Sequence, residues 1–447
     1  MPAGAIASEQ IVRGPEEDDG AHPLTGMQPL LFITHQFSPT VGGSIRWTEQ
    51  LCRDYAGGGV SVLTRDVGGA VDFDSDSVRI RRVPLRMVPW LRPESLLFYR
   101  KFCAAGLQVA RKDRPAIVAA ASVAPDGLVA MQLKRNLGLP YVVLAHGEEI
   151  TVPLHSKRRR MTRFMKLTAM RQVFRNADRV IVNSRHTEET VHAFAGSEVA
   201  TRILHPGADL QVFHPEGPDL RQELGLGQRP VILTVGHLMH RKGQVRVIEA
   251  MPRVLRQLPE AVYLMAGTGV HEVAMRQAAK AAGVEHAVRF LGHVEEEALP
   301  SLYRTADVFT LANRNLPDGD FEGFGIVYLE AAASGLPVVV GERTGNADAV
   351  IDDVTALRVN PEDPGDLAGA LMRLLQDGAL AKRMGAAGRD FVTRDFAPGR
   401  LAANWNEILR GAIAEFLQEP GSTAAAEGPD RGSFAPSTPD AERPSPG

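Results

Sequence analysis

The stretch Asp318-Gly-Asp-Phe-Glu-Gly-Phe-Gly-Ile-Val-Tyr-Leu-Glu-Ala-Ala-Ala-Ser-Gly-Leu-Pro337 decides the fold that we predict. It begins with turn-forming residues and becomes helical near Gly325. Gly335 suits the C-terminal cap of this helix because it has no Cβ, and Pro337 prevents the helix from resuming. The β-branched run over residues 338–340 then predicts a buried parallel strand.

Two glutamates flank the start of the predicted helix. Glu322 lies in the loop before it, and Glu330 lies inside its second turn. The first N–H groups of a helix have no intrahelical partner and carry its positive dipole end, so a phosphate can bind there. A carboxylate on each side of an anion site suits a ligand with hydroxyls on both sides of a diphosphate, such as a nucleotide sugar. Alternatively, these are only acidic residues that favour a helix N-terminus.

The two glutamates have seven residues between them, and Ala-Ala-Ala-Ser-Gly-Leu-Pro-Val-Val follows the second. This pattern resembles the signature of glycosyltransferase family 4. The resemblance implies an α/β architecture of the GT-B type, with two Rossmann-like domains facing across a cleft and a C-terminal helix crossing back to the N-terminal domain. It also implies transfer of a hexosyl group, with retention, from GDP-mannose or a UDP-hexose to an acceptor hydroxyl. Lipid-linked acceptors and cell-envelope glycan precursors are both compatible with it.

The order of elements along the chain also predicts two domains. A strand at Pro29–Thr34, a glycine loop and a helix begin a Rossmann-like half. Pro and Gly residues over 202–215 predict a hinge. We expect a disordered segment over 1–27, an N-terminal acceptor domain over 28–210, a nucleotide-sugar donor domain over 211–395, a crossover helix over 396–418 and a disordered tail over 419–447.

Bulk properties narrow the cellular setting. The formal net charge of -3 gives no reason to expect nucleic-acid binding. Cys52 and Cys103 are the two cysteines, which predicts a reducing cytoplasm rather than a disulfide framework. No apolar run reaches the length of a membrane span, and residues 1–27 lack the apolar core of a secretory signal.

Candidate site residues in the first domain lie after strands. Gly42 and Gly43 follow the first strand, and the resemblance implies that their backbone approaches the donor's phosphate and sugar. His146 ends the strand Tyr141–Ala145, at the edge where open α/β sheets bind ligands. A lone histidine is more often structural, but the resemblance implies that this imidazole contacts the transferred sugar.

In the second domain, a cation at the strand-to-helix turn could offset the charge of a departing diphosphate. Basic residues at turns are usually just solvated, but Lys242 matches the phosphate-binding lysine of the family. The family commonly has arginine where this chain has His237, and imidazole is only partly charged at neutral pH. Either Arg241 compensates, or phosphate binding is weaker and depends on pH.

The resemblance completes the predicted site. Glu322 holds sugar hydroxyls, Glu330 holds the ribose, and the backbone at Val294 lines the base pocket. Because Glu322 lies in a loop, we expect Glu322→Ala to abolish transfer without harming the fold. The predicted catalytic residues are Glu322, His146 and Lys242, and the predicted donor-binding residues are Gly42, Gly43, His237, Arg241, Lys242, Val294, Phe324, Gly325, Ile326 and Glu330.

Asp318-Gly-Asp320 suggests a metal site, because paired carboxylates bind Mg²⁺ or Mn²⁺ with a diphosphate. Asp-Gly is also common turn chemistry. Lys242 and the helix dipole already supply positive charge, so we expect a metal-independent enzyme with no cofactor beyond its nucleotide-sugar co-substrate.

The most basic segment, residues 155–175, has apolar residues at helical spacing, including Phe164, Leu167 and Met170. It is either a solvated helix packed on its own domain, a surface for anionic phospholipid, or a site for an acidic acceptor. The second reading places the protein on the inner face of the plasma membrane. Its cations are Lys157, Arg158, Arg159, Arg160, Arg163 and Lys166.

Two other functions remain open: a nucleotide-sugar epimerase of the same fold, and a non-catalytic nucleotide-sugar-binding protein. A dinucleotide dehydrogenase is disfavoured because the loop after the first strand lacks G-x-G-x-x-G. The base, the sugar and the acceptor are not determined by the sequence.

Overall fold

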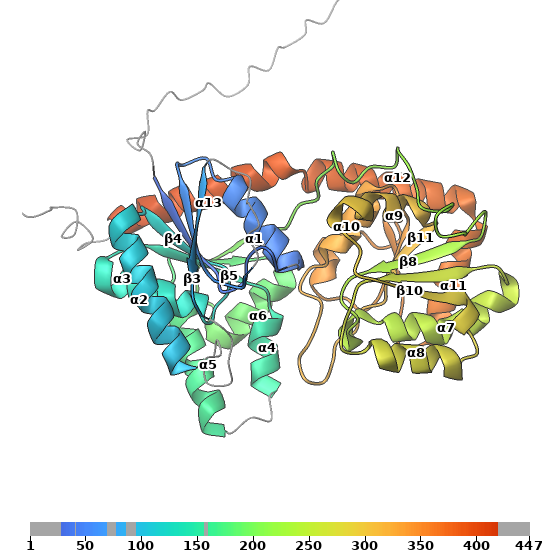
Figure 1. Cartoon of the computed structure of the whole chain (residues 1–447), viewed down its shortest axis with the longest axis horizontal. Coiled ribbons are helices and arrows are strands. Elements are labelled where there is room, and N and C mark those ends of the chain that lie inside the picture. Colours follow the sequence, from blue (N-terminus) through green and yellow to red (C-terminus); the bar gives the residue numbers. More distant parts are fainter. Residues whose placement is uncertain (1–27, 41, 69–76, 86–94, 156–159, 419–447) are drawn as a thin grey trace, which may run out of the picture.

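The computed structural model describes residues 28–40, 42–68, 77–85, 95–155 and 160–418. The two predicted disordered segments, 1–27 and 419–447, and the basic residues Lys157, Arg158 and Arg159 lie outside these ranges. The described residues form two lobes side by side (Figure 1). We call the lobe whose sheet lies within residues 30–203 the N-lobe, and the lobe whose sheet lies within residues 231–358, which the sequence analysis predicts to bind the donor, the donor lobe.

The N-lobe is built on a parallel sheet that has, in the described ranges, seven strands in the order β3-β2-β1-β4-β5-β6-β7. The strands are β1 (Leu30–Ile33), β2 (Val60–Arg65), β3 (Val78–Val83), β4 (Ile117–Ala120), β5 (Tyr141–Ala145), β6 (Arg179–Val182) and β7 (Thr201–Ile203), and the helices are α1 (Gly43–Arg53), α2 (Leu96–Asp113), α3 (Asp126–Leu137), α4 (Glu148–His155), α5 (Arg160–Asn176) and α6 (Arg185–Ala195). The central strands β1, β4 and β5 are short apolar runs buried on both faces, as expected of a parallel sheet, whereas the edge strands β3 and β7 are partly exposed.

The donor lobe repeats this plan with a parallel sheet in the order β10-β9-β8-β11-β12-β13. Helices α9 and α10 cover one face, and α7, α8 and α11 cover the other, while α12 contributes Val392 to the first core and Leu380 and Met384 to the second. The strands are β8 (Val231–Val235), β9 (Val262–Ala266), β10 (Val288–Gly292), β11 (Val308–Leu311), β12 (Val338–Val340) and β13 (Ala356–Arg358), the α-helices are α7 (Gln244–Gln257), α8 (Glu272–Ala281), α9 (Leu299–Thr305), α10 (Ile326–Ala333), α11 (Pro364–Gln376) and α12 (Gly378–Asp395), and the 3-10 turns are η1 (His240–Lys242), η2 (Glu285–Ala287), η3 (Glu296–Ala298) and η4 (Gly345–Asp348).

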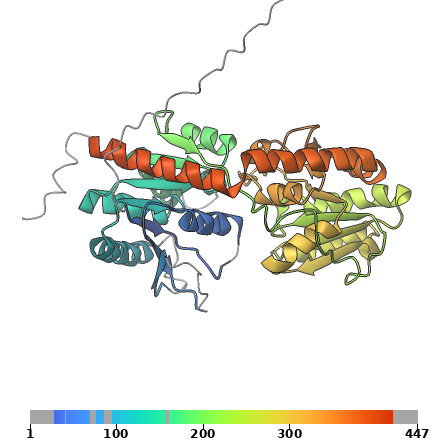
Figure 2. The same cartoon turned by 90° about the horizontal axis from the view of Figure 1, so that it is seen from above.

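The last helix, α13 (Pro398–Gln418), leaves the donor lobe and lies along the N-lobe (Figure 2). Its Trp405 and Leu409 are fully buried against the face of the N-lobe sheet that α1 also covers. Beside the start of α13, Ala208 N–H of the first interlobe connection donates to Phe396 O at 3.4 Å. The two connections between the lobes, one near Ala208 and one near Phe396, therefore lie next to each other.

This architecture confirms the predicted α/β fold with two Rossmann-like lobes and a C-terminal helix that crosses back. The exact domain boundaries stay predictions. Within the described residues, no helix is long and apolar enough to cross a membrane.

Candidate functional site

The start of α10 faces the N-lobe. Gly325 precedes the helix with φ +86°, in the left-handed region that favours glycine. A Cβ on Gly43 of the N-lobe would lie 3.7 Å from Ile326 Cδ1, so the two loops are close neighbours. The Gly42–Gly43 loop and the predicted phosphate seat at Ile326 therefore come together across the lobes.

Glu322, in the loop before α10, is buried and bound by two cations. Its Oε2 lies 2.6 Å from Lys242 Nζ and 3.1 Å from Arg241 Nη1. Burial works to raise the pKa of Glu322, but Lys242 and Arg241 outweigh it and hold the pKa below the ordinary value. The carboxylate is thus kept charged and accepts hydrogen bonds.

Arg241 is surrounded by carboxylates. Besides Glu322, its Nε lies 3.0 Å from Asp320 Oδ1, and its Nη2 lies 3.0 Å from Glu148 Oε2 on α4 of the N-lobe. Burial raises the pKa of Asp320 to about 6, against the lowering effect of Arg241. Three carboxylates are paired with Arg241. Its charge is therefore not free to take the place of the arginine that the family commonly has at the position of His237. The side chain of His237 is exposed, with Nδ1 3.4 Å from Thr268 O.

His146 meets the Glu322 loop from the opposite lobe. A Cβ on Gly323 would come within 2.5 Å of His146 O, so the loop packs directly on this residue. The ring Nε2 lies 2.9 Å from Ala121 O, and the ring edge contacts Trp47. Since a carbonyl only accepts, Nε2 carries the proton and Nδ1 is the acceptor of the neutral ring. The structure therefore places the backbone of His146 against the loop that carries Glu322.

Glu330 is bound on both of its oxygens. Tyr303 O–H donates to Oε2 at 2.6 Å, and Arg46 Nη1 on α1 donates to Oε1 at 2.9 Å. Arg46 also reaches Glu296 Oε1 at 2.6 Å. Burial raises the pKa of Glu330, although Arg46 and Tyr303 oppose it. The predicted ribose ligand is thus joined to the N-lobe in this structure.

Sequence reasoning missed Arg46, Tyr303 and Glu148, and it considered Asp320 only as a possible metal ligand or turn residue. Arg46 and Glu330 are separated by 284 residues, and no local pattern in the sequence pairs them. The available signal was position alone, because Arg46 follows the Gly42–Gly43 pair by one helical turn.

Two other predicted donor residues serve packing with their side chains. Val294 is half-buried against the donor-lobe core. The ring of Phe324 is buried and stacks on His205, with ring centroids 5.4 Å apart, and it also contacts Phe396. The ring of Phe324 therefore packs at the connection between the lobes, and only the backbone of this residue is left to contact a donor.

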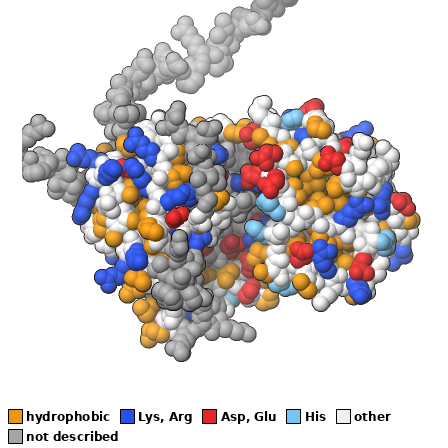
Figure 3. Space-filling model, in the orientation of Figure 1, with side chains coloured by type: hydrophobic (Ala, Val, Ile, Leu, Met, Phe, Trp, Pro, Cys, Tyr) orange, Lys and Arg blue, Asp and Glu red, His pale blue; other side chains and the backbone are white. Residues whose placement is uncertain are grey.

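The basic segment is only partly described. Arg160 is the first residue of α5, while Arg163 and Lys166 are half-buried, and Arg163 Nη1 donates to Leu154 O at 3.5 Å. Leu167 and Met170 pack into the N-lobe core, as in the first of the three interpretations of this segment. Phe164 was expected on the same face but is 64% exposed, because the first turns of α5 project beyond the lobe, where Met161 and Met165 are exposed as well. Hydrophobic side chains gather at this tip (Figure 3).

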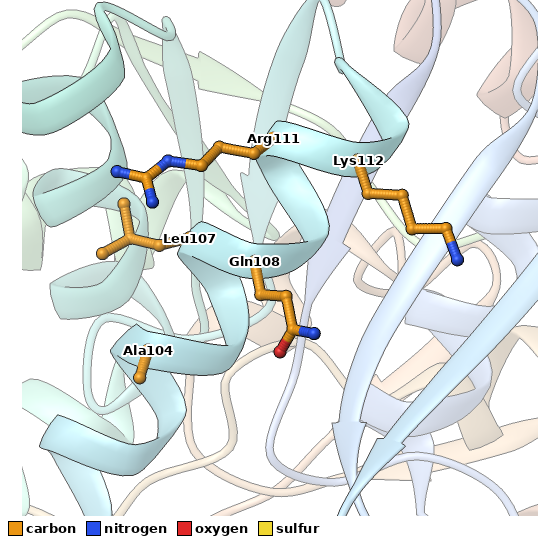
Figure 4. Close-up of a pocket in the computed structure, with 5 residues that line it drawn as sticks. All are labelled: Ala104, Leu107, Gln108, Arg111 and Lys112. Carbon is orange, nitrogen blue, oxygen red and sulfur yellow. The ribbon is translucent and has the colours of Figure 1, made fainter.

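Two further features are relevant to this location, namely groups of metal-ligating side chains among the described residues and the surface of α2. Within the described ranges, no group of three or more His, Cys, Asp and Glu side chains is arranged to hold a metal ion. An open hollow on α2 of the N-lobe (Figure 4) is lined by Ala104, Leu107, Gln108, Arg111 and Lys112. In contrast, acidic and histidine side chains gather along the margin of the donor lobe that faces the N-lobe (Figure 3).

Comparisons with known proteins give family matches in both halves of the chain. Residues 41–212 match the family model described as Glycosyltransferase Family 4, and residues 217–391 match the one described as Glycosyl transferases group 1. The chain is 30% identical over 400 residues to the GDP-mannose-dependent alpha-(1-6)-phosphatidylinositol monomannoside mannosyltransferase of Mycolicibacterium smegmatis, covering 87% of this chain and 98% of that protein. It is 35% identical over 228 residues to the D-inositol 3-phosphate glycosyltransferase of Corynebacterium jeikeium, covering 48% of this chain and 53% of that one.

Among solved structures, the sucrose-phosphate synthase of Thermosynechococcus elongatus is similar, with a TM-score of 0.75 and 26% identity. The match covers 87% of this chain and 100% of that one.

Proposed function

The chain belongs to glycosyltransferase family 4, and on this premise we propose that it transfers a hexosyl group from a nucleoside diphosphate sugar to an acceptor hydroxyl, with retention at the anomeric carbon. One observation carries the proposal. Glu322, Lys242 and the start of α10 gather on the donor lobe directly opposite His146 and Gly43 of the N-lobe.

Each group in this cluster has a chemical task. Lys242 and the first N–H groups of α10 stabilise the negative charge that develops on the departing diphosphate, and each such preorganised donor is worth about 3 kcal/mol. Glu322, kept ionised by Lys242, accepts hydrogen bonds from sugar hydroxyls. His146 holds the sugar from the other side. A phosphate oxygen of the donor takes the proton of the acceptor hydroxyl, so no separate protein base is needed.

The lobes are already bridged by Arg46–Glu330 and Arg241–Glu148. Closed lobes exclude water, which protects the activated sugar from hydrolysis.

The favoured donor is GDP-mannose, because the relative matched over 98% of its length is named for that donor. Thermal unfolding of the purified protein against GDP-mannose, UDP-glucose and other nucleotide sugars tests this choice. We expect the largest stabilisation with GDP-mannose, and mannosylation of a phosphatidylinositol mannoside when it is added. Glu322→Gln is expected to lose transfer, while Glu272→Gln, which alters an exposed pair with Arg276 on α8, serves as the control.

Incubation of the donor without acceptor separates the competing functions. A transferase leaves the sugar unchanged apart from slow hydrolysis, whereas an epimerase converts it to a stereoisomer. Stable binding of the donor, with no product from any acceptor, would indicate a non-catalytic binding protein.

We also propose that the tip of α5 meets the anionic inner face of the plasma membrane. Its support is the exposed Met161, Phe164 and Met165 beside a cationic segment, and each cation near such a surface contributes about 1 kcal/mol. Sedimentation with vesicles tests it. Binding should require anionic lipid and should weaken in Phe164→Ser/Met165→Ser, while equal binding to neutral vesicles would contradict the proposal.

A further inference from the structure

Two cationic side chains stand side by side on the N-lobe, outside the cluster described above. Arg65 ends β2, and His35 follows β1 by two residues. The parallel register aligns Ile33 with Leu63, which places residues 35 and 65 next to each other at the carboxyl edge of the sheet. Arg65 Nε donates to His35 O at 3.0 Å.

A buried carboxylate fixes the orientation of His35. Asp126, the first residue of α3, is 0% exposed. Its oxygens accept from His35 N–H at 2.9 Å, from His35 Nδ1 at 3.1 Å and from Ser122 Oγ at 2.8 Å. The ring is therefore held through Nδ1, with Nε2 on its opposite side. Among the described residues, neither this Nε2 nor the terminal nitrogens of Arg65 have a hydrogen-bond partner.

The local electrostatics favour a charged imidazole. Burial lowers the pKa of His35, but Asp126 outweighs burial and raises it, despite the opposing charge of Arg65. Glu149 on α4 also faces His35 and favours its charged form. Burial raises the pKa of Glu149 and so favours the neutral form of that carboxyl. His35 and Arg65 thus place N–H groups side by side, and the setting of His35 favours its charged form.

This pair lies on the acceptor side of the transfer site. β1 and β5 are separated by β4 in the sheet, so His35 and His146 stand two strand spacings apart on one edge. That separation is roughly 10 Å. An acceptor anchored at His35 would therefore extend a hydroxyl toward His146 and the donor sugar.

We propose that His35 and Arg65, with His35 oriented by Asp126, bind a phosphate group of the acceptor. Charged N–H groups bind phosphate oxygens strongly, and the fork of arginine suits them. The names of two relatives contain an inositol that carries phosphate, one in a lipid and one as a free phosphate ester. The inference rests on the proposed transferase function, because it assigns one end of the acceptor in that reaction.

The test measures binding rather than turnover. Isothermal titration with D-inositol 3-phosphate, and in parallel with phosphatidylinositol in detergent micelles, is done in saturating GDP, which fills the donor phosphate site. We expect Arg65→Gln and His35→Gln each to weaken binding of the phosphate compound about tenfold or more, as for loss of a charged hydrogen bond. The arm in which binding is seen identifies a free ester or a lipid headgroup as the source.

Controls separate this result from misfolding and from failure of the proposed function. Arg111→Gln alters a cation on the outer face of α2 and should bind like the unaltered protein. Arg65→Lys keeps the charge and should recover part of the affinity. GDP affinity should be unchanged in all variants, and thermal unfolding should be unchanged in Arg65→Gln, Arg65→Lys and Arg111→Gln. His35→Gln removes the partner of the buried Asp126 and should unfold at a lower temperature, so Arg65→Gln is the variant that reports on phosphate binding without loss of stability. Unaltered phosphate affinity in Arg65→Gln and His35→Gln, or no phosphate binding by the unaltered protein in either arm, would overturn the inference. Absence of GDP binding would instead refute the donor assignment.

Discussion

Glu322→Gln should destabilise the donor lobe strongly, although residue 322 lies in a loop. The carboxylate is 5% exposed and pairs with Lys242 at 2.6 Å. Removing one partner of a buried ion pair costs about 3–5 kcal/mol. Arg241 keeps Asp320 and Glu148 as partners, so only Lys242 loses its carboxylate, and the lower value of about 3 kcal/mol applies. The burial and pairing of Glu322 argue against the expectation that Glu322→Ala would spare the fold, and the same measurement tests both.

Calorimetry provides the assay. For a lobe of this size, about 3 kcal/mol lowers the midpoint of thermal unfolding by roughly 6–12 °C. Lys242→Met in the Glu322→Gln background should recover much of the loss, because it removes the unpaired ammonium. Glu296→Gln, which alters a largely exposed carboxylate, should cost less than about 1 kcal/mol.

The effect of pH has a defined sign. Because Lys242 and Arg241 hold the pKa of Glu322 below its ordinary value, the stabilisation exists above the unfolded pKa of about 4.3 and is lost as pH falls through the folded one. The difference in unfolding midpoint between the unaltered protein and Glu322→Gln should therefore become smaller at acidic pH. A midpoint for Glu322→Gln within about 2 °C of the unaltered protein at neutral pH would refute the reasoning, since it would mean less than about 1 kcal/mol for this pair.

Three further predictions follow from the ion pairs and from His237. Arg46→Gln removes a bridge between the lobes at Glu330, so small-angle scattering should show a larger radius of gyration without ligand, and an unchanged curve would count against a bridging role. Because the pKa of Asp320 is raised to about 6, the folded state binds a proton that the unfolded state has lost between about pH 4 and 6, and stability falls as pH rises through that window. The free energy of unfolding, measured with urea at about pH 5 and 7.5, should fall by at most about 3 kcal/mol in the unaltered protein and should not fall in this way in Asp320→Asn. The same fall in both proteins would exclude this carboxyl as the cause. His237→Arg restores the family's cation and should tighten GDP binding about tenfold by a charged hydrogen bond, whereas unchanged titration isotherms would show that position 237 does not reach the diphosphate.

The sequence predicted the elements well because their signals are local. The buried run Val338–Val340, the left-handed Gly335 after α10 and the strand Tyr141–Ala145 each follow from a few adjacent residues. The apolar residues of the terminal segment likewise indicated a packed helix, and Trp405 is fully buried.

The interactions between the lobes were not predictable in this way. Arg46 and Glu330 belong to different lobes, and nothing near either residue encodes the other. His35 and Asp126 are separated by 91 residues and meet only because β1 and β4 pair in the sheet. Phe164 fits the helical period of the buried stripe but lies beyond the edge of the lobe. The helical period of a sequence does not indicate where along the helix the lobe ends.

The packing of α13 on the N-lobe has a consequence for synthesis on the ribosome. The last strand of the N-lobe sheet ends at Ile203, whereas Trp405, which covers one face of that sheet, is about 200 residues later. At a synthesis rate of about 5–20 residues per second, roughly 10–40 s pass between the translation of Ile203 and that of Trp405. During this interval the apolar face of the nascent sheet is available to chaperones and to neighbouring chains, so a slow-codon pause or premature stop shortly before residue 398 should favour aggregation more than the same event after residue 418.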